Sequence, residues 1–159
     1  MDPLVERQRA LQEEAAAVLD DLELLPLLQT LGDPVKVGSV ALGLMVARDI
    51  DLTILCPELD AGRVFEVVQP LVAHPRVREL RFRNDTGHWN DDSNFTRSTL
   101  STSSLLPPRL TPEARLAILR IKDDCLGRPW YSSHHITTAV LDHGVRTTQA
   151  FRAHLEGAR

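Results

Sequence analysis

The alternation of apolar and polar positions predicts helices at both ends of the chain and strands between them. Asp2-Pro3 has the residue types of an N-cap followed by the first helical position. The apolar stripe that follows at helical spacing consists of Leu11, Ala15, Val18 and Leu22. Gly32-Asp33-Pro34 is expected to end this helical region, because glycine and proline interrupt helices.

The middle of the chain predicts a short strand, a short helix and a second strand, followed by another helix and strand. Val35-Lys36-Val37 is the first strand, residues 40–46 form the short helix, and Asp49-Ile50-Asp51-Leu52 lies on the second strand. Residues 60–73 form the next helix, with Pro70 as a kink or early end. Residues 77–83 alternate with period two and predict a third strand.

The C-terminal part predicts helices alone. Thr111-Pro112-Glu113 is a typical helix start, and Gly127-Arg128-Pro129 is expected to end that helix. Two shorter helices, residues 132–143 and 147–156, follow on either side of Gly144. We therefore expect an α+β protein with a mixed α/β core and N-terminal helix in residues 1–106, and a C-terminal helical segment in residues 107–159.

Composition narrows the class of protein. The chain has 159 residues, 43% of them hydrophobic, and a formal net charge of −4. This balance gives no general attraction to nucleic acid. Cys56 and Cys125 lie in apolar segments and indicate reduced core thiols. The sequence shows no signal peptide and no long apolar run, so we expect a cytoplasmic protein without a membrane partner.

Two carboxylates are the first candidate for chemistry. In an extended strand Asp49 and Asp51 would point to the same side, with Cα atoms roughly 6.6 Å apart. Ile50 and Leu52 would then face the opposite, buried side. Two like charges this close are usually compensated by a cation or by solvent. Mg²⁺ commonly takes one or two protein carboxylates and fills its other positions with water and phosphate oxygens.

The residues before the acids suit a phosphate group. Gly38 allows close approach of the backbone, and Ser39 opens the short predicted helix, whose free N–H groups attract anions. Arg48 and Lys36 are the nearest basic candidates for phosphate oxygens, although solvated surface charge is the commoner role for each. The ordinary alternatives are an edge strand with solvated acids and a serine N-cap. The two features together favour a functional site.

At Val37, Gly38, Ser39, Asp49, Ile50 and Asp51 the chain resembles the nucleotidyltransferase superfamily with the polymerase-beta-like fold. The signature of that superfamily is an apolar residue, Gly, Gly or Ser, a spacer of about ten residues, and Asp-x-Asp or Asp-x-Glu. The resemblance covers roughly residues 30–85. It implies Mg²⁺-dependent transfer of a nucleoside monophosphate from an NTP such as ATP to an acceptor, with Asp49 and Asp51 as metal ligands and Gly38 and Ser39 on the phosphates.

The resemblance also implies a third carboxylate on a later strand, and the chain departs from the pattern there. Asp85 is the best candidate by position, followed by Asp91 and Asp92 in a polar loop. Residues 93–104 are Ser or Thr at eight of twelve positions, with no apolar alternation. Two hypotheses therefore stay open: an active nucleotidyltransferase whose acceptor is a small molecule, a protein side chain or an RNA end, and a degenerate member that binds nucleotide or a protein partner without turnover.

Overall fold

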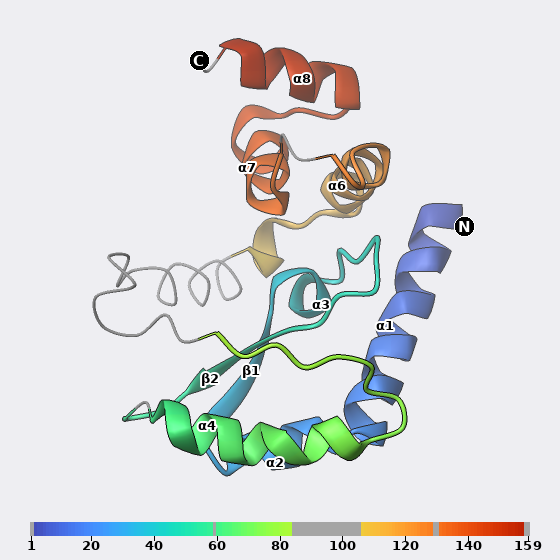
Figure 1. Ribbon diagram of the computed structural model, residues 1–159. Coiled ribbons are helices and arrows are strands. Elements are labelled where there is room, and N and C mark those ends of the chain that lie inside the picture. The colour runs from blue at the N-terminus through green and yellow to red at the C-terminus, as the bar shows by residue number, and fades with distance from the viewer. Residues whose placement is uncertain (1, 59, 84–105, 129–130, 158–159) are drawn as a thin grey trace.

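A computed structural model describes residues 2–58, 60–83, 106–128 and 131–157 (Figure 1). The predicted α+β class is confirmed, because helices flank one small antiparallel sheet. The helices are α1 (Pro3–Asp21), α2 (Leu24–Gln29), α3 (Gly38–Leu42), α4 (Ala61–Val68), α6 (Pro112–Asp124), α7 (Ser133–His143) and α8 (Thr148–Gly157), with 3₁₀ turns η1 (Gln69–Ala73) and η3 (Pro107–Arg109).

The helix starts expected from the sequence are confirmed. Asp2, Thr111 and Ser132 each accept a hydrogen bond from a backbone N–H in the first turn of the helix that follows. Gly144, with φ +66°, ends α7 in the left-handed conformation. The first helical region is broken earlier than expected, because Glu23 adopts φ +46° between α1 and α2.

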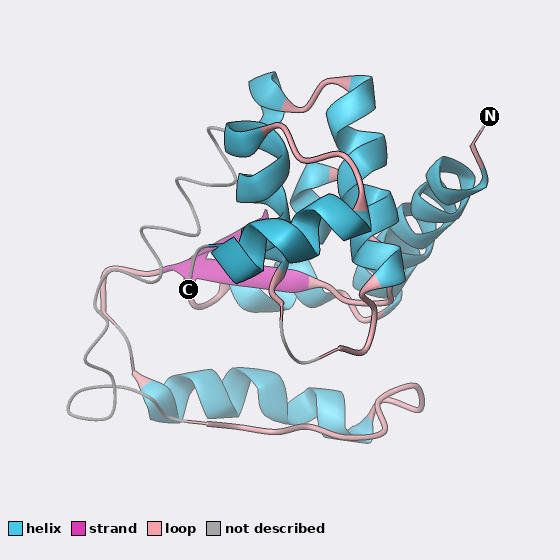
Figure 2. Ribbon diagram, turned by 90° about the horizontal axis from the view of Figure 1, so that it is seen from above, coloured by secondary structure: helices cyan, strands magenta, loops and turns pink. Residues whose placement is uncertain are grey.

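The sheet has two strands, β1 (Asp33–Val37) and β2 (Asp51–Leu55), shown in magenta in Figure 2. They run antiparallel, with Val37 opposite Asp51 and Asp33 opposite Leu55. This register brings the residue after β1, Gly38, next to the first residue of β2. The short helix α3 between the strands ends at Gly43, earlier than the expected residue 46. Gly43 adopts φ +65°, which favours glycine and terminates the helix.

Two groups of buried residues hold the fold together. The larger group joins α6, α7 and α8 to the residues just after α3, and its fully buried members include Ile118, Ile121, Ile136 and Phe151 together with Leu44. The smaller group packs α1 on α3 through Ala15, Val40 and Met45, with Leu11 and Ile50 against it. Leu44 and Met45 therefore place the segment after α3 between α6 and α1.

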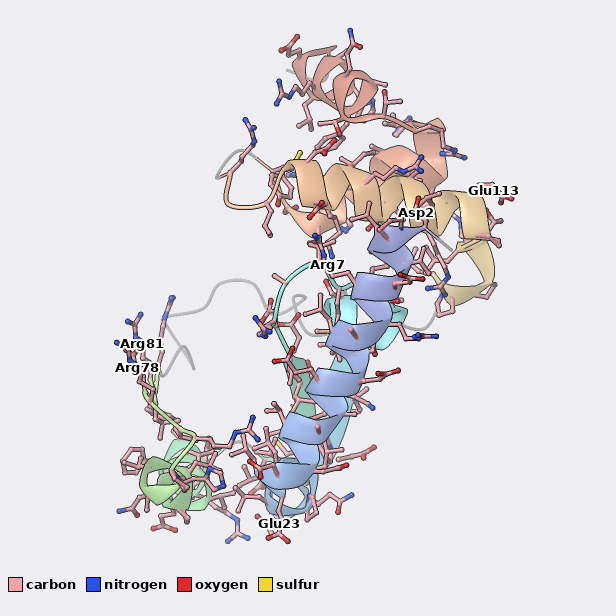
Figure 3. All side chains as sticks on the ribbon, turned by 90° about the vertical axis from the view of Figure 1, so that its right-hand side faces the viewer. Asp2, Arg7, Glu23, Arg78, Arg81 and Glu113 are labelled. Carbon is pink, nitrogen blue, oxygen red and sulfur yellow. The ribbon has the colours of Figure 1, made fainter. Side chains whose placement is uncertain are left out.

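Helix α1 is also attached to α6 through charged side chains. Arg7 pairs with Asp123, and Arg120 donates to Asp2 at 2.9 Å. Figure 3 shows Asp2 and Arg7 at the end of α1 that meets α6, and Glu23 at the opposite end. The helical C-terminal part thus packs against both α1 and the strand–helix–strand unit. The proposed division of the chain at residue 106 stays a prediction.

The expected third strand at residues 77–83 is wrong. This segment has no regular secondary structure, and the only ladder among the described residues joins β1 and β2. The Phe82 ring instead packs edge-on against Phe65 of α4, with ring centroids 5.8 Å apart. Pro70 lies in the 3₁₀ turn that follows α4, which confirms the early end of that helix.

Candidate functional site

The candidate site forms where the end of β1, the start of β2 and the last turn of α6 meet. Gly38 adopts φ +63°, a conformation that strongly favours glycine. A Cβ atom at this position would lie well within 3.0 Å of a carboxylate oxygen of Asp51, closer than real Cβ contacts. Glycine is therefore favoured here for two reasons: it adopts this backbone conformation readily, and it leaves space for the Asp51 carboxylate.

Lys122 of α6 supplies a buried cation to this place. Its side chain is only 5% exposed, and its Nζ donates hydrogen bonds of 2.7 Å to Ser39 Oγ and 2.7 Å to the Leu44 carbonyl. Burial lowers the pKa of Lys122 from its ordinary value to about 8, against the opposing effect of the Asp49 and Asp51 carboxylates. The Lys122 ammonium is thus the cation that contacts the Gly38-Ser39 turn, and the nearby Asp49 and Asp51 carboxylates more than offset its charge.

Asp49 lies close enough to Asp51 to affect its ionisation. The pKa of Asp51 is raised, first by partial burial and then by the negative charge of Asp49, while Lys122 acts in the opposite direction. Only Asp51 belongs to β2, so the expectation that both acids occupy alternate positions of one strand is wrong for Asp49. The chain enters β2 only after Ile50, which packs against the α1 cluster. Both carboxylates remain exposed to a ligand.

Arg48 lies apart from the Gly38-Ser39 turn. Its Nε donates a 2.6 Å hydrogen bond to Glu14 of α1, and its side chain is 79% exposed. Lys36 is also exposed, on β1. The cation nearest to Ser39 is instead Lys122. The basic side chain that contacts this turn therefore comes from a position 83 residues further along the chain.

Helix α3, which contains Ser39, contributes less to anion binding than the sequence indicates. Helix α3 has five residues, and the dipole effect of a helix depends on aligned peptide units over several turns. The Ser39 carbonyl accepts a backbone hydrogen bond from Leu44, at 3.0 Å, which closes the turn. Positive potential here comes mainly from the Lys122 ammonium, so a phosphate group would be held by a side chain more than by the helix end.

Asp85, Asp91 and Asp92, the candidates for a third carboxylate, lie outside the described residues. Within the described part of the chain, no three His, Cys, Asp or Glu side chains are placed to hold a metal ion together. Asp49 and Asp51 nevertheless fit the minimum that Mg²⁺ needs from a protein, since phosphate oxygens and water commonly complete its coordination.

A hollow of about 300 Å³ adjoins Asp49 on the side of α1. Its lining side chains come from α1 and from the segment before β2: Leu11, Glu14, Ala15, Val18, Met45, Arg48, Asp49 and Ile50. The sequence analysis missed this hollow. The stripe Leu11, Ala15 and Val18 marks the buried side of α1, but no pattern shows that it leaves space beside Asp49.

No family model, no curated protein and no solved structure matches the chain. None of the helices in the described ranges has the length and apolar character of a membrane span.

Proposed function

We propose that the protein is a Mg²⁺-dependent nucleotidyltransferase that binds the triphosphate of an NTP between the Gly38-Ser39 turn and the acids Asp49 and Asp51. The observation that carries this proposal is the Lys122 contact with Ser39 Oγ, beside two carboxylates. A buried ammonium is costly unless it has partners or a role. Its place next to a Gly-Ser turn and an acid pair suits a ligand that is a polyanion with a bound metal.

The hydrogen bonds of Lys122 define what Ser39 offers to a ligand. An ammonium has only donors, so the serine oxygen must accept from it and the serine hydrogen must point elsewhere. The Ser39 hydroxyl is then free to donate to a phosphate oxygen. Gly38 lets the backbone approach the same phosphate without a side chain in between. Lys122 thus orients Ser39 and adds its charge to the phosphate site.

The two acids supply the metal-binding part of the proposed site. Asp49 and Asp51 would hold Mg²⁺, which when bound offsets the charge of the triphosphate. The acceptor nucleophile would attack the α-phosphorus, the bond to the bridging oxygen would break, and pyrophosphate would leave with the electron pair. The acceptor proton would pass to a nearby carboxylate and from there to solvent.

A second function, nucleotide binding without turnover, would apply if none of Asp85, Asp91 and Asp92 joins the two acids. No third carboxylate joins Asp49 and Asp51 within the described ranges, and two-metal transfer needs ligands for both ions. Release of pyrophosphate in the presence of candidate acceptors separates the two functions. Both share the binding of a metal–nucleotide complex.

Mn²⁺ in place of Mg²⁺ tests this shared step by electron paramagnetic resonance. We expect the protein to broaden the Mn²⁺ spectrum much more with ATP than without it, because the phosphates complete the coordination of the ion. Asp51→Asn should remove this change. The matched control is Asp60→Asn, which alters an exposed N-cap of α4 outside the site. An unchanged Mn²⁺–ATP spectrum on addition of the wild-type protein would contradict the proposed function.

A further inference from the structure

The hollow beside Asp49 has a built apolar wall. Leu11, Ala15 and Val18 of α1 face Met45 and Ile50 of the segment that leads into β2. Met45 is 2% exposed and Ala15 4%, so the inner wall is fixed by the same packing that attaches α1 to α3. A volume of about 300 Å³ is at the lower end of small-molecule sites. The hollow therefore suits a compact ligand with an apolar body.

The hollow is lined by two acidic side chains, Glu14 and Asp49, and by one basic side chain, Arg48. Arg48 is bound to Glu14 at 2.6 Å, and its charge is therefore compensated within the protein. The carboxylate of Asp49 is left to face a ligand. An apolar hollow with one available carboxylate at its edge is complementary to an apolar molecule that carries an amine.

We propose that this hollow binds compact apolar amines, with the ammonium group on the Asp49 carboxylate and the apolar body against Ala15 and Met45. A carboxylate has two oxygens and about four lone-pair positions, so Asp49 can contact an ammonium and a metal ion at once. Because Asp49 belongs to both sites, the hollow holds the amine-bearing part of the acceptor. This last step rests on the proposed function, whereas the binding of amines does not.

The methionines of this chain provide a direct test. The sequence contains two, Met1 and Met45, and Met45 lines the hollow. Protein labelled with ¹³C at the methionine methyl groups is titrated with cyclohexylmethylamine, cyclohexylmethanol and cyclohexanecarboxylate, without nucleotide or Mg²⁺. We expect a saturable shift of the Met45 signal with the amine, at least five-fold weaker binding of the alcohol, and no shift with the carboxylate, from the charge-assisted contact with Asp49. Met1 serves as the internal reference.

Matched variants locate the ligand. Asp49→Asn should abolish the preference for the amine over the alcohol while the alcohol still binds, and because Asp49 is exposed this change leaves the core intact. Ala15→Leu should fill the hollow and remove binding of the amine and of the alcohol. Ala16→Leu, on the exposed side of the same helix, should change the binding of neither the amine nor the alcohol. Thermal unfolding of each variant shows whether the fold is retained.

Three results would overturn the proposal. Equal affinity for the amine, alcohol and carboxylate would exclude a role for Asp49. Absence of any shift of Met45 would exclude a ligand site. A larger shift with adenosine than with the amine would assign the hollow to the nucleotide base. None of these depends on whether NTP and Mg²⁺ bind, so failure of this proposal and failure of the proposed function are observed separately.

Discussion

Replacement of Gly38 by alanine is expected to abolish Mg²⁺-dependent NTP binding and to destabilise the protein by about 1–3 kcal/mol. The residue has φ +63°, and its new Cβ would collide with the Asp51 carboxylate. Relief of that collision requires the Asp51 carboxylate to move away from the turn, which separates the proposed metal ligand from the proposed phosphate site. Calorimetric titration with NTP and Mg²⁺ measures the binding, and urea denaturation measures the stability.

Gly144→Ala is the matched control for this change. Gly144 has a similar φ of +66°, and a Cβ there would meet no atom within 4 Å. This variant should show the backbone cost alone, about 1 kcal/mol, with unchanged nucleotide binding. If Gly38→Ala bound Mg²⁺–NTP as the wild type does, the close approach of Gly38 to Asp51 would have no functional meaning.

Replacement of Lys122 by methionine should weaken NTP binding about ten-fold or more, because a charge-assisted contact is worth roughly 1.5–3 kcal/mol. The change in the free energy of unfolding should be smaller than the change in the free energy of NTP binding. The variant removes a buried charge, which is favourable, but leaves Ser39 Oγ and the Leu44 carbonyl without their donor. Lys122→Arg, which keeps the charge in a wider group, should retain part of the affinity.

The difference in the free energy of unfolding between the wild type and Lys122→Met should depend on pH. The folded protein releases the Lys122 proton near pH 8, and the unfolded chain near 10.5. Between these values the unfolded chain binds more protons, so the stability of the wild type relative to Lys122→Met should rise with pH. The expected gain is about 3 kcal/mol in total at 1.36 kcal/mol per pKa unit. A stability difference that stays constant from pH 7 to pH 10 would mean that Lys122 is not a buried cation.

The parts of the fold set by local sequence were predictable. The N-caps Asp2 and Thr111 follow from the side-chain oxygens that they offer to free N–H groups. The approach of Gly38 to Asp51 follows from two apolar strands joined by a short helix, since antiparallel pairing places the end of one strand beside the start of the next. Local periodicity thus accounts for the placement of Gly38 beside Asp51.

The parts that depend on long-range packing were not predictable. Lys122 is 83 residues from Ser39, and only the packing of α6 on the segment after α3 brings them together. One pattern was visible: Lys122 is four residues from Ile118, on the buried face of its helix, where a lysine is unusual. Residues 77–83 are the opposite case: their alternation predicts a strand that the fold does not contain, and Phe82 packs on α4 instead.

Calorimetric titration of the wild-type protein and of the Asp49→Asn/Asp51→Asn variant with each NTP, with and without Mg²⁺, tests the central claim most directly. The account predicts Mg²⁺-dependent binding of at least one NTP to the wild type and at least a ten-fold loss in the variant, because the two carboxylates hold the ion that the phosphates share. Equal binding by both proteins, or no binding of any NTP to the wild type, would contradict it.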